Sequence, residues 1–120
     1  MITKRFGKVG GFSEMAFGER VIVIARSIPK GKVMTYGGIA RAAGGAPITA
    51  QSITSILGKA YDRGAKDIPF HRIVYSDGRV WIDESHYKER MQKYAEEGIE
   101  VTERGRIVNF EQKLFEPFAT

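Results

Sequence analysis

The sequence predicts a small α/β domain of the winged helix-turn-helix class. Two segments with helical periodicity, one on each side of the glycine pair 44–45, predict a helix-turn-helix. Further along, the β-rich runs 73–75 and 79–82 flank a Ser-Asp-Gly turn at 76–78, and this pattern predicts a hairpin that serves as the wing. A chain of 120 residues fits one domain. A domain of this size buries roughly two-thirds of the surface of its unfolded chain.

The charge of the chain is unevenly distributed. The formal net charge is +5, but residues 1–66 carry a balance of +8 and residues 67–120 a balance of −3. Such a division suits a protein whose basic face binds a polyanion such as a nucleic acid while its acidic face is turned away. The alternative is a basic soluble protein that binds no polyanion. The chain has no cysteine, which excludes a thiolate nucleophile, a disulfide and a thiolate metal site.

No run of apolar residues approaches the roughly 20 needed to cross a membrane, and the N-terminus lacks the apolar region of a signal peptide. We therefore expect a soluble intracellular protein. Two histidines, no cysteine and no cluster of metal-ligating residues predict neither a metal nor a cofactor.

The first segment, residues 1–12, is rich in glycine and basic residues and predicts a flexible arm ahead of a single domain at 13–120. Ser13 offers an N-cap for the first helix, which Pro29 ends. We expect this helix to be core scaffolding. Its apolar residues at helical spacing are Phe17, Val21, Ile24 and Ile28.

The second and third helices form the predicted helix-turn-helix. Thr35 caps the second helix, with Ile39 and Ala43 facing inward, and Thr49 offers a cap for the third. Small polar residues on the exposed face of the third helix would let its backbone approach a duplex groove closely. The predicted buried stripe is Ile53, Ile56, Leu57 and Ala60, and the predicted exposed face is Gln51, Ser52, Ser55 and Lys59.

The last third of the chain predicts a fourth helix and a second hairpin. Ser85 offers the cap of this helix and Gly98 its C-terminal end. The runs 99–102 and 106–108 around a Glu-Arg-Gly turn predict the hairpin. The residues expected to face the core here are Tyr87, Met91 and Tyr94 from the helix, and Phe110 and Phe115 from the end of the chain.

A site is predicted at residues 68–74, IPFHRIV, where a His-Arg pair lies at the start of an apolar run. With Pro69, His71, Arg72, Ile73 and Val74, and with PKGKVMTYGGIA at 29–40, the chain resembles the DNA-binding domain of the O6-alkylguanine-DNA alkyltransferases from about Ser13 to Phe115. In those enzymes a cysteine that accepts the alkyl group follows the proline, whereas this chain has Phe70. The substitution resembles the cysteine-less branch, the alkyltransferase-like proteins, which bind alkylated DNA without repairing it.

The resemblance implies that DNA is bound and that a nucleotide is rotated out of the stack. Tyr36 would lie beside the phosphate of that nucleotide, although a tyrosine in a first helical turn also packs readily. Gln51 stands where the family usually inserts an arginine into the stack, and it brings less reach and no cation. The implied DNA-binding residues are Tyr36, Gln51, Ser52, Ser55, Lys59 and Arg72. The implied lesion pocket is Tyr36, Leu57, Phe70, Ile73, Val80 and Trp81.

The Trp81 position keeps two interpretations. Trp81 either stacks on an extruded base or anchors the wing to the core.

The resemblance pairs His71 with Glu97, a contact that helps to deprotonate the cysteine in the enzymes. Because Phe70 leaves nothing to deprotonate, we expect that contact to be a structural remnant here.

The resemblance therefore implies a non-enzymatic protein that binds O6-alkylguanine in duplex DNA and marks the lesion for nucleotide excision repair, with a repair factor as a further partner. We expect a monomer in the cytoplasm at the nucleoid, or in the nucleus of a eukaryote. One alternative is a winged-helix DNA-binding or regulatory protein without lesion specificity. The other is an enzyme that uses His71 or Tyr36 on another substrate, for which the chain offers little machinery.

Overall fold

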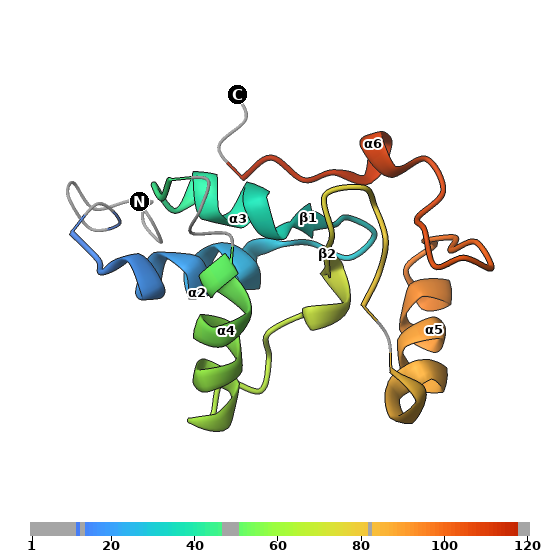
Figure 1. Cartoon of the computed structure of the whole chain (residues 1–120), viewed down its shortest axis with the longest axis horizontal. Coiled ribbons are helices and arrows are strands. Elements are labelled where there is room, and N and C mark those ends of the chain that lie inside the picture. Colours follow the sequence, from blue (N-terminus) through green and yellow to red (C-terminus); the bar gives the residue numbers. More distant parts are fainter. Residues whose placement is uncertain (1–11, 13, 47–50, 82, 118–120) are drawn as a thin grey trace.

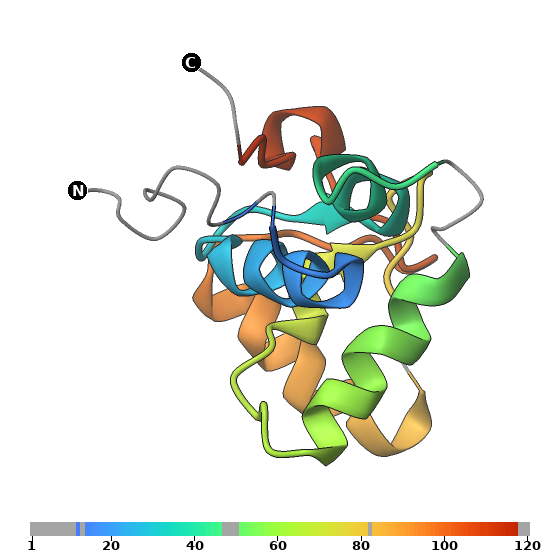
Figure 2. The ribbon, with the colours of Figure 1, turned by 90° about the vertical axis from the view of Figure 1, so that its left-hand side faces the viewer.

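The structure is a computed structural model in which residue 12 and residues 14–46, 51–81 and 83–117 are described. Helix α2 lies between α3 and α4, and α4 and α5 extend on the two sides of the turn η2 (Figures 1 and 2). In chain order the elements are α2 (Phe17–Ser27), β1 (Met34–Thr35), α3 (Tyr36–Ala42), α4 (Ile53–Asp62), η2 (Phe70–Arg72), β2 (Ile73–Val74), η3 (Glu84–His86), α5 (Tyr87–Glu96) and α6 (Phe110–Lys113).

Two apolar clusters hold these elements together. The larger joins α2, α3 and α4, and a fully buried isoleucine or leucine contributes about 1.5 to 3 kcal/mol relative to an exposed one. The smaller lies under α5 and the C-terminal turns. Fully or nearly fully buried side chains include Val21, Ile24, Ile39, Ile53 and Leu57 in the larger cluster, and Val33, Val74, Tyr94, Ile99 and Ile107 in the smaller.

The helix-turn-helix prediction is confirmed in its main features. Thr35 caps α3, because its Oγ1 accepts a hydrogen bond from the Gly38 amide at 2.8 Å. Ile39 and Ala43 are buried, as predicted. On α4 the predicted apolar stripe faces the core, and the predicted polar face is exposed. The predicted cap Thr49 lies outside the described residues.

Two helix starts differ from the prediction. Helix α2 begins at Phe17 rather than after Ser13, which lies outside the described residues, and the Glu19 carboxylate accepts from the Ala16 amide at 3.1 Å. The predicted cap Ser85 is wrong, because Asp83 Oδ1 is the acceptor of the His86 amide at 3.0 Å. A carboxylate two residues earlier reaches the free amides of this turn better than the serine does.

Helix α5 buries less than its sequence suggests. Met91 is partly buried and Tyr94 almost fully, as expected, but Tyr87 is 55% exposed and its inward prediction is wrong. Tyr87 opens the helix, ahead of the stretch that packs against the smaller cluster.

The wing differs from the predicted regular hairpin. Its turn forms, since the Tyr75 amide donates to the Arg79 carbonyl and the Gly78 amide to the Tyr75 carbonyl, both at 2.9 Å. However, β2 pairs in parallel with β1, and Arg79 bridges to Arg106 of the second turn. Gly78 has φ +86°, and a Cβ there would lie 3.0 Å from the Phe110 ring. This close approach explains why the turn needs glycine.

The second predicted hairpin is present as a short turn. The Thr102 amide donates to the Arg106 carbonyl at 2.8 Å, and the Val108 amide donates to the Glu100 carbonyl at 2.9 Å. Phe110 and Phe115 pack on the two apolar clusters, as predicted. Within the described ranges, no helix combines the length and the apolar character that crossing a bilayer requires.

Candidate functional site

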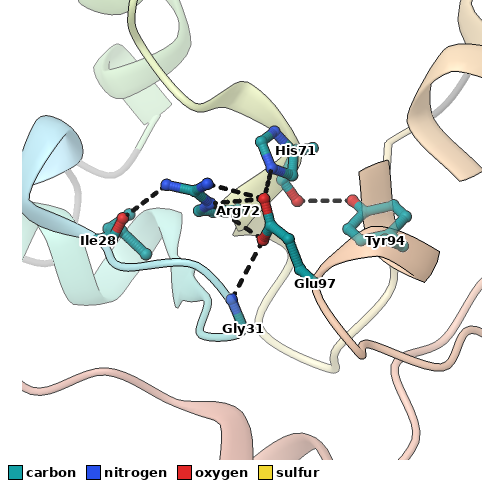
Figure 3. Close-up of polar contacts among 6 residues, drawn as sticks. All are labelled: Ile28, Gly31, His71, Arg72, Tyr94 and Glu97. Carbon is teal, nitrogen blue, oxygen red and sulfur yellow. Dashed lines mark hydrogen bonds and ion pairs between the residues drawn. The ribbon is translucent and has the colours of Figure 1, made fainter. Parts of the chain in front are cut away.

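A cluster of buried polar groups fixes the turn that carries the predicted site. Glu97 is its centre: its Oε2 lies 2.7 Å from His71 Nε2 and 2.7 Å from Arg72 Nη2, and its Oε1 accepts from the Gly31 amide at 3.2 Å (Figure 3). Arg72 Nη1 also donates to the Ile28 carbonyl at 2.9 Å. We call these five residues the clamp. It ties the end of α2 and the end of α5 to η2.

The protonation states in the clamp follow from its geometry. Burial opposes ionisation of Glu97, but the hydrogen bonds from Arg72, His71 and the Gly31 amide outweigh it and lower the pKa of Glu97 to about 2. Burial lowers the pKa of His71, although Glu97 partly offsets that effect. His71 Nε2 faces the Glu97 carboxylate, and an ionised carboxylate can only accept a hydrogen bond. A neutral His71 ring must therefore carry its proton on Nε2. The predicted His71–Glu97 contact is therefore formed, with His71 as the donor.

A tyrosine supports η2 from the side of α5. The Tyr94 hydroxyl donates to the His71 carbonyl at 2.6 Å, and the two rings meet edge to face at 6.0 Å (Figure 3). Burial raises the pKa of Tyr94 to about 12. Its hydroxyl therefore stays protonated and keeps this hydrogen bond through the physiological range.

Arg72 takes an internal role in this structure. Its side chain is 14% exposed, and its guanidinium donates to Glu97 and to Ile28. A guanidinium held in this way would have to leave a buried carboxylate in order to reach a phosphate. The geometry therefore argues against the predicted DNA contact of Arg72.

A hollow of about 400 Å³ opens beside Phe70 and His71. Its lining comes from the C-terminal half of α4, from η2 and the loop before it, and from the segment from η3 into α5. The Phe70 ring contacts Tyr61 edge to face at 5.7 Å, and the Lys66 ammonium lies 3.8 Å from the centre of the Tyr61 ring. Side chains that line it include Tyr61 from α4, Phe70 and His71 from η2, and Arg90 and Lys93 from α5.

The six predicted pocket residues separate into core residues, one residue that lines the hollow, and two that lie outside its lining. Leu57 and Ile73 belong to the buried core at 0% and 2% exposure, and Val80 packs on the smaller cluster. These three residues belong to or pack on the core and do not line the hollow. Of the six, only Phe70 lines the hollow; Trp81, which is 46% exposed, contacts Arg90, and Arg90 lines the hollow. Tyr36 is half-buried, with its ring 5.7 Å from that of Tyr75.

The predicted DNA-facing residues lie on α4 and in the turn just before it, and they are exposed. Gln51, Ser52, Ser55 and Lys59 are all exposed, as expected for a helix that offers one face to a groove. Lys59 is the only cation among these four. Their contacts with DNA stay a prediction.

The sequence prediction missed the residues that α5 contributes to the hollow. Arg90 and Lys93 lie seven and four positions before Glu97, so the three share one helical face. Since the resemblance already paired Glu97 with His71, that spacing was the available signal. Tyr61 and Lys66 lie in and after the last turn of α4, where no periodic pattern indicated them.

Comparison with known proteins places these features in a family. The model of the 6-O-methylguanine DNA methyltransferase DNA-binding domain matches residues 16–99. The chain is similar to a DNA base-flipping protein of Vibrio parahaemolyticus, with 38% identity over 73% of this chain and 85% of that protein. It is also similar to a bifunctional methyltransferase/endonuclease of Thermoplasma volcanium, with 34% identity over 81% of this chain but 30% of that longer protein.

Solved structures agree with the sequence comparisons. The fold resembles S. pombe Atl1 in complex with damaged DNA containing O6-carboxymethylguanine, with a TM-score of 0.65 and 27% identity over 84% of this chain and 95% of that one. This match and the family model confirm the predicted winged helix-turn-helix class. The irregular wing is thus a variation on a known architecture.

Proposed function

Because the chain belongs to the family of the 6-O-methylguanine DNA methyltransferase DNA-binding domain, we propose that it binds duplex DNA containing an O6-alkylated guanine and turns that nucleotide out of the stack. The alkyl group stays on the base. Relatives named as base-flipping proteins and a relative solved with damaged DNA support this proposal.

The observation that carries the proposal is the environment of Phe70. The clamp holds η2 in one conformation, and Phe70 projects from it beside a hollow that is open rather than filled. Phe70 stands where the alkyl-transferring relatives have the acceptor cysteine. An apolar ring offers a stacking surface to a bulky base but has no lone pair with which to accept an alkyl group.

The exposed face of α4 and Tyr36 supply the path for the nucleotide in this proposal. The exposed face of α4 would approach the groove, and Tyr36 at the start of α3 would lie beside the backbone of the extruded nucleotide. Extrusion costs a few kcal/mol and is cheapest at a damaged pair. Gln51 would fill the vacated space with less reach than the arginine usual in the family, so we expect weaker flipping.

A binding titration tests this function. Two duplexes that differ only by one O6-methylguanine are titrated at several salt concentrations, because phosphate contacts weaken as salt rises. We expect a preference for the damaged duplex that grows with salt, and we expect Tyr36→Ala to reduce that preference more than it reduces general binding. Equal affinity for both duplexes would instead favour a winged-helix DNA-binding protein without lesion specificity.

The non-enzymatic character has its own test. A duplex labelled on the O6-alkyl group is incubated with the protein, and the label should remain on the DNA. Label on the protein or in solution would revive the enzymatic alternative, to which the methyltransferase/endonuclease of Thermoplasma volcanium gives some weight.

The last part of the proposal is biological. A protein that holds a lesion without repairing it is useful when it marks the site for nucleotide excision repair, at the nucleoid or in the nucleus of a eukaryote. We expect it to act as a monomer. A purified excision-repair reaction on the damaged duplex should run faster when the protein is added, and an unchanged rate would count against the marking role.

A further inference from the structure

Arg90 contacts Trp81 and also lines the hollow. Its Nη1 donates to the Trp81 backbone carbonyl at 3.0 Å, and its guanidinium carbon lies 5.8 Å from the centre of the Trp81 ring. The same side chain lines the hollow beside Phe70. One arginine of α5 therefore holds both the backbone and the ring of Trp81 while it faces the candidate site.

Trp81 is an unusual residue to leave at a surface. Tryptophan is highly buried on average, yet this one is 46% exposed. Within the described part of the chain, Arg90 makes the one aromatic or cation–π contact of the Trp81 ring. A guanidinium on one face of an indole leaves the other face for a second flat group, and unstacked bases bind to such aromatic surfaces.

The charge of Arg90 reaches other aromatic residues as well. Burial raises the pKa of Tyr36, and the positive charge of Arg90 works against that rise. Burial likewise raises the pKa of Tyr94 to about 12, and Arg90 opposes it there too. Arg90 thus lies close enough to act on the residue predicted to meet the DNA backbone and on the residue that supports η2.

We propose that Arg90 is a positioning residue of the lesion site, which holds Trp81 at the edge of the hollow as a wall on which an extruded O6-alkylguanine stacks. This inference rests on the proposed function. It gives Trp81 the stacking role rather than the anchoring role, because the ring is exposed and is held by a side chain of the site.

Arginine suits this task better than lysine. Its planar guanidinium lies over the indole while an N–H at its edge donates to the carbonyl, and a lysine ammonium does not combine the two contacts. A positive charge alone therefore does not hold Trp81 in this position. A substitution by lysine should separate the geometric role from a general attraction to DNA.

The experiment uses the single tryptophan of the chain, since its fluorescence reports on Trp81 alone. The whole protein is titrated with an O6-methylguanine duplex and with the matched intact duplex. In the wild type, we expect the damaged duplex to quench Trp81 more strongly than the intact one does. The variants are Arg90→Ala, Arg90→Lys and Lys88→Ala, which removes an exposed cation from the same helix.

In Arg90→Ala we expect the difference in quenching to disappear and the preference for damaged DNA to fall by roughly tenfold, the effect of losing about one base–aromatic contact. Affinity for intact DNA should fall no further than in Lys88→Ala. Arg90→Lys should recover only part of the preference. Thermal melting checks that each variant is folded. If Arg90→Ala is unfolded, Arg90→Lys provides the comparison of quenching, and Trp81→Ala, which has no tryptophan left to report, provides the comparison of affinities for the two duplexes.

Two outcomes would overturn the inference without touching the proposed function. One is a preference for damaged DNA in the wild type with no difference in Trp81 quenching. The other is an equal loss for both duplexes in Arg90→Ala, fully restored by lysine, because a phosphate contact behaves in that way. A wild type without any preference for damaged DNA would instead remove the proposed function, and the inference with it.

Discussion

The clamp and the hollow share η2 and α5 but are built in opposite ways. In the clamp, Glu97 meets three donors and its side chain is 7% exposed. In the hollow, the charged side chains of Glu89 and Lys93 form no ion pair with another described residue, and the Lys66 ammonium lies over the Tyr61 ring rather than beside a carboxylate. Paired buried charges hold a conformation, whereas unpaired side chains around a space remain available to a ligand. We therefore expect the clamp to determine stability and, under the proposed function, the hollow to bind the base.

Removing the centre of the clamp should have the largest effect on stability. Glu97→Ala leaves the Arg72 guanidinium buried without its partner, so we expect a loss of about 3 to 5 kcal/mol in the free energy of unfolding. Urea denaturation measures it. Glu100→Ala, at an exposed position three residues later, is the control and should change stability by at most about 0.5 kcal/mol. If Glu97→Ala lowered the free energy of unfolding no more than Glu100→Ala does, the clamp would not be what stabilises this part of the fold.

Acid should weaken the clamp in two stages. The pKa of His71 lies below its ordinary value of 6.5 in the folded state, so the unfolded chain takes up a proton first and stability falls as the pH drops below about 6.5. The pKa of Glu97 is about 2 rather than 4.5, so a second loss begins below about pH 4.5. Urea unfolding from pH 8 to pH 3 measures both stages. A His71→Gln variant that kept the first stage would contradict the assignment.

A single hydrogen bond at the edge of the clamp should matter less. Tyr94→Phe removes the donor to the His71 carbonyl, and we expect a loss of about 1 kcal/mol, the usual net value of one such bond. Because the aromatic ring remains, the core should keep its packing. A loss as large as that of Glu97→Ala would mean that the hydroxyl is as important to the clamp as the carboxylate.

The sequence predicted the clamp better than the hollow. The His71–Glu97 pair followed from the match of Glu97-Gly98 to the family, and helical periodicity correctly indicated Ile39, Ile53 and Leu57 as core. Periodicity identifies the buried face of an element, but it does not reveal which neighbouring element completes a concave surface. For that reason Leu57 was assigned to a pocket that it does not line, and Arg90 was missed.

The wing shows a second limit of the sequence. Two β-rich runs around an Asp-Gly turn favour a hairpin, and the turn itself formed. Tertiary contacts determine which segments pair. β2 pairs in parallel with β1, and Arg79 bridges to Arg106 in the second turn. β-propensity reports a fit to a pleated surface rather than the identity of the neighbour.

The smallest effect on stability is expected for a substitution in the wall of the hollow. Such a variant separates the proposed binding role of the hollow from the stabilising role of the clamp. Tyr61 is 39% exposed and meets Phe70 edge to face, so Tyr61→Ala should lower the free energy of unfolding by only about 0.5 kcal/mol. Its loss opens the wall beside Phe70. We therefore expect a several-fold weaker preference for the O6-methylguanine duplex, measured by the titration described above.

Tyr87→Ala is the matched control, because it removes an exposed tyrosine that opens α5 and does not line the hollow. It should cost as little stability as Tyr61→Ala and leave the preference for damaged DNA unchanged. If the two variants lost that preference equally, exposed aromatic area in general would account for binding, and the hollow would have no special role. If neither lost it, the base would have to be held elsewhere on the domain.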